Sequence, residues 1–175
     1  MHLRVQMKNR EICCCFSGHR PQKLPWGMRE SDERCIKTCE WISNQLEELY
    51  SLGYRVFISG MAIGCDTFFA NAVLELKSRH DDVELVAAIP CADQASRWNS
   101  RQKETYSRLL EQCDEIKIFS ESYTPSCMQT RNNYMVDNSS ALIACYSGRP
   151  GGTMKTILYA EREGLDVRVL DLYDL

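Results

Sequence analysis

The chain has 175 residues, and its formal net charge is −3. This length allows one compact domain, and 44% apolar with 26% charged residues is the balance of an ordinary globular protein. These values exclude collagen and intrinsic disorder, and no apolar run approaches the roughly 18 residues that suggest a membrane span.

The first ten residues carry charge but no apolar stretch, and the apolar run that follows at 12–16 is too short for the core of a signal peptide. We therefore expect a flexible N-terminal stub at residues 1–10 and a single domain at residues 11–175. Without an export signal, the expected location is the cytoplasm.

Apolar runs and helical periodicities alternate along the chain. Continuous apolar runs predict strands at 12–16, 54–58, 83–89, 115–119, 141–146 and 167–172. Between them the spacing predicts amphipathic helices, and Cys35, Ile42 and Leu49 share the apolar face of the first one. Asp66 is expected at the N-cap of the helix after the second strand. The order predicts a three-layer, Rossmann-like α/β fold, with a mostly parallel sheet of about six strands and helices on both faces.

Ten cysteines would suggest a disulfide scaffold in a short secreted chain, but here they contain no CxxC pair. Cys13, Cys14 and Cys15 are adjacent, so in a strand they alternate faces and cannot all bind one metal ion. We interpret most cysteines as small buried apolar residues and predict no metal site. Cys65 and Cys91 are the exceptions, because they lie at the edge of the predicted pocket, where a thiol is open to reaction.

Ligands of open parallel sheets bind at the carboxyl ends of the strands, near the switch in strand order. Glycine-rich segments follow three of the predicted strands, and two of them lead directly into helices, whose N-termini suit phosphate. A single such turn is also consistent with simple chain reversal. The candidate ligand-binding residues in these segments are Gly18, Ser59, Gly60, Met61, Gly64, Gly148, Gly151, Gly152 and Thr153.

Basic residues at the same strand ends contrast with the acidic chain and favour a small anionic ligand. The candidates are His19, Arg20 and Arg131 with Asn132, and Arg131 is equally consistent with a buried structural ion pair. Trp98 is placed either to stack on a nucleobase or to pack as a lid over the sheet edge. His19 is a candidate acid or base, although no carboxylate is evidently paired with it. The sequence contains neither a Walker A motif nor a GxGxxG fingerprint.

Several segments, taken together and in order, resemble the YpsA-like family of bacterial Rossmann-fold proteins in the SLOG superfamily. That superfamily also contains DprA and the LOG-type phosphoribohydrolases. The segment at 59–66 is similar to the Ser-Gly-Leu-Ala-x-Gly-Ile-Asp element of DprA. Residues 150–153 resemble a shortened form of the Pro-Gly-Gly-x-Gly-Thr-x-x-Glu element of LOG enzymes. The segments that carry the resemblance are 17–21, 58–66, 88–90, the region of Trp98, 131–137, 151–153 and 159–160.

The chain departs from the LOG element at its catalytic position. Thr153 is followed by Met154, Lys155 and Thr156, with no glutamate where the catalytic one belongs, and Glu161 lies about two helical turns further on. This departure speaks against LOG-type catalysis and leaves the catalytic residues unassigned.

The resemblance implies a protein that binds a nucleotide or nucleotide-derived ligand, ADP-ribose-like, at the carboxyl edge of the sheet, as a sensor or carrier. In that interpretation Asp66 either caps its helix or contacts a ribose. The alternatives are an N-glycosidic hydrolase of LOG type, DprA-like binding of single-stranded DNA, and an adaptor in a protein assembly. An acidic pI near 5.7 disfavours a broad nucleic-acid surface. The expected cofactor is at most a bound nucleotide or phosphate, no membrane partner is expected, and the resemblance implies a homodimer.

Overall fold

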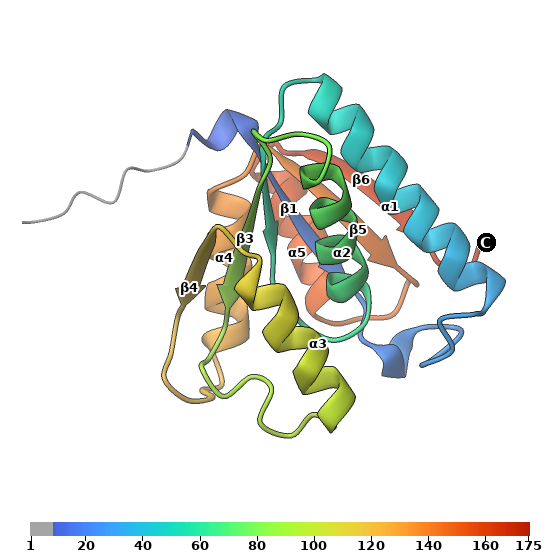
Figure 1. Ribbon diagram of the computed structural model, residues 1–175, viewed down its shortest axis with the longest axis vertical. Coiled ribbons are helices and arrows are strands. Elements are labelled where there is room, and N and C mark those ends of the chain that lie inside the picture. Colours follow the sequence, from blue (N-terminus) through green and yellow to red (C-terminus); the bar gives the residue numbers. More distant parts are fainter. Residues whose placement is uncertain (1–8) are drawn as a thin grey trace, which may run out of the picture.

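A computed structural model describes residues 9–175 as a six-stranded sheet between two layers of helices (Figure 1). All strands are parallel, in the order β4-β3-β2-β1-β5-β6. The predicted three-layer α/β class is therefore confirmed. The strands are β1 (Cys13–Gly18), β2 (Val56–Ser59), β3 (Glu84–Ile89), β4 (Glu115–Ile118), β5 (Ala141–Tyr146) and β6 (Asp166–Asp171).

The helices divide between the two faces of the sheet. One face carries α1 (Glu33–Ser51), α2 (Cys65–Lys77) and α3 (Ser100–Glu111), and the other carries α4 (Cys127–Asp137) and α5 (Gly152–Arg162). From β1 the chain proceeds outward through β2 and β3 to β4, then returns to the other side of β1 with β5. The switch in strand order therefore lies between β1 and β5.

Strand β1 supplies both hydrophobic cores because successive side chains point to opposite faces. Cys14 and Phe16 pack into the core under α1 and α2, where Phe16 stacks on Phe69 with ring centroids 4.6 Å apart. Cys13 and Cys15 belong to the core under α4 and α5. Among the described residues no disulfide joins any of the ten cysteines, and eight of them are buried, which confirms their predicted structural role.

Helix α1 forms where the periodicity predicts it. Asp32 caps its first turn by accepting a hydrogen bond from the Arg34 backbone N–H at 3.0 Å. Ile42, Leu46 and Leu49 are buried on one face, and Gly53 follows the helix with a left-handed φ of +101°.

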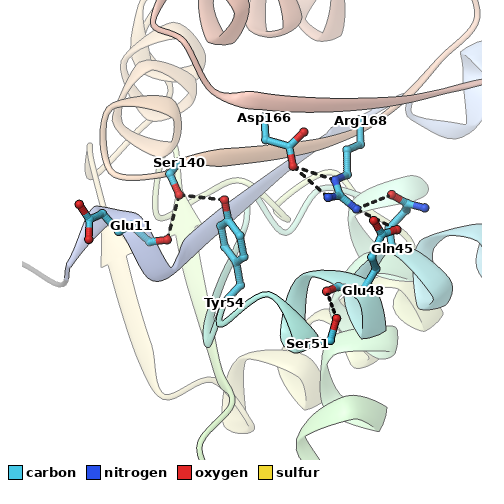
Figure 2. Close-up of polar contacts among 8 residues, drawn as sticks. All are labelled: Glu11, Gln45, Glu48, Ser51, Tyr54, Ser140, Asp166 and Arg168. Carbon is cyan, nitrogen blue, oxygen red and sulfur yellow. Dashed lines mark hydrogen bonds and ion pairs between the residues drawn. The ribbon is translucent and has the colours of Figure 1, made fainter.

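Polar contacts close the amino end of the sheet, opposite the predicted site (Figure 2). The Ser140 hydroxyl donates to the Glu11 carbonyl oxygen at 3.0 Å and shares a 3.1 Å hydrogen bond with the Tyr54 hydroxyl. On edge strand β6, the Arg168 guanidinium bonds to Asp166 at 3.0 Å and to Gln45 of α1 at 3.1 Å. These contacts fasten β5 to the N-terminal segment and β6 to α1.

The predicted N-terminal stub falls almost wholly outside the described residues. Within them, Asn9 caps a short 3-10 helix at Arg10–Ile12, and Arg10 Nε donates to the Ser139 carbonyl oxygen at 2.7 Å. In the part of the chain that the structure describes, no helix is both long and apolar enough to cross a membrane.

Candidate functional site

A cavity of about 360 Å³ opens at the carboxyl end of β1, the strand that borders the switch in strand order. Its walls are the end of β1, the loops that follow β1 and β2, the first turns of α2 and α5, and helix α4 from Met128 to Met135. We call it the switch cavity and define it by its lining residues: Phe16, Ser17, Gly18, His19, Arg20, Gln22, Lys23, Ala62, Asp66, Met128, Arg131, Asn132, Met135, Gly152 and Thr153.

Arg131 reaches the switch cavity from α4 and is 5% exposed. Its Nη1 donates to the carbonyl oxygens of Gly60 at 2.6 Å and Ala88 at 3.2 Å, and its Nε donates to Asn132 Oδ1 at 2.8 Å. Burial lowers the pKa of the guanidinium, and the Asp66 carboxylate opposes that shift. Arg131 therefore holds the ends of β2 and β3 while it adds positive charge to the cavity.

Asp66 is not the N-cap that the sequence predicts, and that prediction is wrong. Gly64 occupies the cap with φ +93°, because the loop after β2 must turn sharply against the loop after β1. A Cβ at Gly64 would lie 2.7 Å from the His19 carbonyl oxygen, which accepts a hydrogen bond from the Cys65 N–H. Asp66 lies in the first turn of α2, 6% exposed, where Oδ2 accepts from the Ala62 N–H at 3.1 Å. Burial raises the pKa of this carboxyl, against the effect of Arg131.

His19 is 3% exposed and connects the loops after β1 and β5. Its Nε2 accepts a hydrogen bond from the Ser147 N–H at 3.2 Å, so in the neutral ring the proton is on Nδ1. Burial, together with the charges of Lys23 and Arg149, lowers the pKa of His19 to about 4. The ring is therefore neutral at pH 7, and its Nε2 is occupied as a hydrogen-bond acceptor.

The glycine-rich start of α5 faces the cations of the loop after β1. Gly152 and Thr153 line the switch cavity, and the N–H groups of a first helical turn have no partners within the helix. Lys23 Nζ donates to the Pro150 carbonyl oxygen at 3.0 Å, and a Cβ at Gly151 would lie 2.6 Å from that nitrogen. Gly151 thus allows Lys23 to approach the start of the helix.

The structure brings eight of the predicted residues together as lining of the switch cavity: Gly18, His19, Arg20, Asp66, Arg131, Asn132, Gly152 and Thr153. Ser59 and Gly60 support it from behind, since Ser59 Oγ accepts from the Met61 N–H at 3.1 Å and Gly60 bonds to Arg131. Gly148 (φ +73°) forms a turn whose Cβ position has no neighbour within 4 Å among the described residues.

Met61, Gly64 and Trp98 line a different cavity. The structure therefore separates Trp98 from Arg131 and the start of α5, and it separates Gly64 from them as well. This second cavity has a volume of about 370 Å³ and lies between α3, α2 and the loop after β1. We call it the α3 cavity. Its lining residues are Pro21, Leu24, Gly27, Met28, Arg29, Glu30, Ser31, Met61, Ile63, Gly64, Thr67, Phe68, Trp98, Asn99, Arg101, Gln102, Thr105, Tyr106 and Leu109.

Sequence reasoning missed the lysine of the switch cavity. Lys23 follows Arg20 in the loop after β1, and this position beside a predicted site was the available signal. Met128 and Met135 on α4 also line the cavity.

Cys65 and Cys91 were expected at the pocket edge, and that prediction is wrong. They are 0% and 2% exposed, and neither lines the switch cavity or the α3 cavity. Burial raises the pKa of Cys91 to about 12, and the adjacent Cys145 thiol with burial raises that of Cys65. Both thiols are buried. The neighbouring residues Gly64 and Pro90, and not the cysteines, lie where the chain leaves the loop after β2 and the end of β3.

Glu161 is exposed on the last turns of α5 and does not line the switch cavity. Among the described residues that line this cavity, Asp66 is the only carboxylate. The cavity therefore combines one buried, hydrogen-bonded carboxylate with three cationic side chains and a neutral histidine.

An open parallel sheet with a cationic cavity at its switch point defines a Rossmann-like α/β protein. The model of the YpsA family, described as the YspA SLOG family, matches residues 14–175, so the chain belongs to this family. The resemblance noted from the sequence is thereby confirmed.

Relatives and solved structures extend this comparison. The chain is 36% identical over 121 residues to the uncharacterized SPbeta prophage-derived protein YoqJ of Bacillus subtilis, covering 62% of this chain and 70% of YoqJ. It is 28% identical over 146 residues to a UPF0398 protein of Bacillus pumilus, covering 81% and 77%.

Two structures of DNA processing protein A share the fold. The protein from Streptococcus pneumoniae aligns with TM-score 0.60 and 19% identity, covering 91% of this chain and half (50%) of the DprA chain. The Helicobacter pylori protein, described in terms of its single-stranded DNA binding mode, aligns with TM-score 0.64 and 15% identity, covering 97% and 73%.

Proposed function

We propose that the protein binds a phosphate-bearing, nucleotide-derived small molecule in the switch cavity, as a sensor or carrier. The observation that carries this proposal is that Arg20 and Lys23 of the loop after β1, Arg131 of α4 and the start of α5 line one cavity at the switch point. Helix N-termini and cationic side chains both favour phosphate oxygens.

The charge balance supports an anionic ligand. Three cationic side chains and one carboxylate line the cavity of a chain whose net charge is −3. Because the pKa of His19 is lowered to about 4, this ring adds no charge at pH 7. The local excess of positive charge is therefore confined to a small concave site, which suits a compact anion.

The volume supports a small molecule. Ligand pockets in proteins hold roughly 300–1,000 Å³, and the switch cavity has about 360 Å³. Single-stranded nucleic acid is the second candidate, favoured by the likeness in fold to the H. pylori DprA whose DNA binding mode is described. A polymer requires a cationic path along its backbone, and the acidic chain offers less support for one.

The same geometry supports binding more than catalysis. Asp66 is the single carboxylate of the cavity and is held by the Ala62 N–H, whereas most glycoside hydrolysis uses a pair of carboxyl groups. His19 is neutral, and its Nε2 is occupied by the Ser147 N–H. These side chains orient the loops and are poorly arranged to transfer protons.

Gly152 offers a sharp test. A Cβ there would have Asn132 Nδ2 as its nearest neighbour, at 3.9 Å, so a side chain can enter the cavity without distorting the fold. Gly152→Asp adds a carboxylate at the start of α5, where negative charge also favours the helix. Gly152→Asn is its uncharged match in shape.

We would titrate AMP, ADP-ribose, NAD and inorganic phosphate into the wild type and both variants by calorimetry. At least one nucleotide is expected to bind the wild type, with a loss of tenfold or more in Gly152→Asp and a smaller loss in Gly152→Asn. Absence of binding by every probe, or equal affinities in the two variants, contradicts the proposal.

Two further measurements distinguish the alternatives. A salt-dependent gel shift with a single-stranded oligonucleotide, abolished in Arg20→Gln, would favour single-stranded DNA over a small molecule as the ligand. Release of free base from bound AMP, monitored by chromatography, would show that the protein is a hydrolase and not a carrier.

A further inference from the structure

The α3 cavity lies on the other side of the loops that border the switch cavity. Along the loop after β2, Ala62 lines the switch cavity while Met61 and Ile63 line the α3 cavity. Along the loop after β1, Arg20 lines the switch cavity and Pro21 lines the α3 cavity. No described residue lines both cavities, so the α3 cavity is a separate compartment behind a shared wall.

Aromatic side chains form much of the α3 cavity. Trp98 and Tyr106 meet edge to face, with ring centroids 5.2 Å apart and planes at 79°. Both are half-buried, and so is Phe68, which lines the cavity from α2. Faces and edges of aromatic rings of this kind favour another planar ring over a flexible chain.

Hydrogen-bond donors accompany these rings. Asn99 Oδ1 accepts from the Gln102 N–H at 2.9 Å, and Gln102 Oε1 accepts from the Asn99 N–H at 3.1 Å, which forms a capping box at the start of α3. Since both carboxamide oxygens are used, each side chain presents its NH₂ group. Thr105, one turn further, adds a hydroxyl to the lining. Ring nitrogens and carbonyl oxygens of a heterocycle accept hydrogen bonds from such groups.

The rim of the α3 cavity carries charge of both signs, from Arg29, Glu30 and Arg101. Arg29 Nη2 forms an ion pair with Asp32 Oδ2 at 3.7 Å. Arg101 is exposed next to the Trp98 segment and forms no ion pair within residues 9–175. A guanidinium beside an indole favours planar, electron-rich groups.

Helix α3 is held less firmly than the other long helices. Leu109 is its only buried residue, and its helical neighbour is α2 (Figure 1). The cavity occupies the space that further side chains would fill in a closely packed interface. A ring bound there would therefore add packing contacts between α3 and α2.

We propose that the α3 cavity is a binding site for a planar heteroaromatic ring of the nucleobase class. The ring lies against Trp98 and Tyr106, and the amide groups of Asn99 and Gln102 contact its polar edge. This site does not rest on phosphate binding in the switch cavity, because the two sets of lining residues are distinct.

The test uses adenosine, which has the ring but no phosphate, in calorimetry with the full chain. Trp98→Phe keeps an aromatic wall and should hold the affinity within about threefold, whereas Trp98→Ala should weaken it at least tenfold. Gly152→Asp, in the switch cavity, should leave adenosine binding unchanged. Circular dichroism and the urea midpoint establish that each variant is folded.

Thr105→Phe provides a second, independent variant, because a larger side chain from α3 fills the cavity without removing an aromatic wall; it should also abolish adenosine binding. Three results would overturn the proposal. They are no binding of adenosine at millimolar concentration, loss of binding in Gly152→Asp but not in Trp98→Ala, and toluene binding as tightly as adenosine, which would indicate an apolar cavity without recognition of a heterocycle.

Discussion

Arg131 on α4 donates from Nη1 to the carbonyl oxygen of Gly60, 2.6 Å away and on the loop that follows β2. A residue from one helical layer thus fixes a loop that leads to the other layer. The guanidinium lies so close to Gly60 that no Cβ fits there, and the Asp66 carboxylate is also within 3 Å of that Cβ position. The glycine is needed at this position for space and not for an unusual φ, since Gly60 is not among the residues with positive φ.

Gly60→Ala should therefore destabilise the fold by about 1–3 kcal/mol, the usual cost of overpacking a filled interior. The added methyl would overlap Arg131 Nη1 and lie 2.9 Å from Asp66 Oδ2. Equilibrium urea unfolding measures the change. Gly152→Ala is the matched control, because its Cβ has 3.9 Å to the nearest side chain, and it should leave the free energy of unfolding unchanged or slightly higher. Equal stabilities for the two variants would contradict this account of Gly60.

His19 makes stability depend on pH. Its pKa is lowered from 6.5 to about 4 by burial and by Lys23 and Arg149, so between these values the unfolded chain binds a proton that the folded chain does not. The free energy of unfolding should therefore fall as the pH drops from 6.5 to 4, by up to about 3 kcal/mol. The raised pKa of Asp66 acts in the opposite direction, so a difference between variants is required.

His19→Gln supplies that difference, since its amide oxygen can accept from the Ser147 N–H while it cannot titrate. Urea unfolding at pH 4, 5, 6 and 7 should show that the free energy of unfolding decreases less toward acid pH in this variant than in the wild type. If the free energy of unfolding depends on pH in the same way in the wild type and in His19→Gln, then His19 is not the source of the pH dependence.

The sequence predicts the fold well because buried parallel strands leave a strong pattern. The apolar run at 141–146 coincides with β5, and the one at 115–119 exceeds β4 by a single residue. At the end of β1 the prediction is less accurate, since the strand continues through Ser17 and Gly18, two residues that read as a turn. Their backbone pairs with β5 regardless of side-chain polarity, and only the three-dimensional neighbour shows this.

The candidate site is less predictable because it depends on which way adjacent residues face. Gly152, Thr153 and Arg131 could be found from glycine-rich turns and from charge in an apolar context. The sequence around Trp98 does not indicate that Trp98 and Arg131 line different cavities. The loop between the two cavities contains Met61, whose φ is +55°. Tertiary packing of the two strand-end loops determines the division.

Arg168 should contribute measurably to stability at the opposite end of the sheet (Figure 2). Its side chain is 15% exposed and bonds to Asp166, Gln45 and Glu48, which ties edge strand β6 to α1. Arg168→Leu should lower the free energy of unfolding by about 1–3 kcal/mol, because hydrogen bonds to charged groups are lost and two carboxylates lose their partner. Arg168→Lys should recover part of the loss, since it keeps the charge without the planar fork.

The control for Arg168 is an exposed pair. Arg162 lies 3.4 Å from Glu163 with its side chain 72% exposed, and Arg162→Ala should change stability by less than about 0.5 kcal/mol. Thermal and urea unfolding should agree on this ranking. A loss in Arg162→Ala as large as that in Arg168→Leu would show that the contacts of Arg168 stabilise the fold no more than an exposed ion pair does.

The thiols should be nearly inert in the folded protein, although the described residues contain no disulfide. Thiolate is the reactive form, and burial raises the pKa of Cys15 and Cys91 to about 12. At pH 7.5, a disulfide reagent such as DTNB should react slowly with Cys39 and Cys113, the two half-buried thiols, and not with the other eight. In urea all ten should react, which provides the internal count. Peptide mapping after brief alkylation with iodoacetamide locates any modified residue. Rapid labelling of Cys65 or Cys91 would contradict their burial in the folded protein.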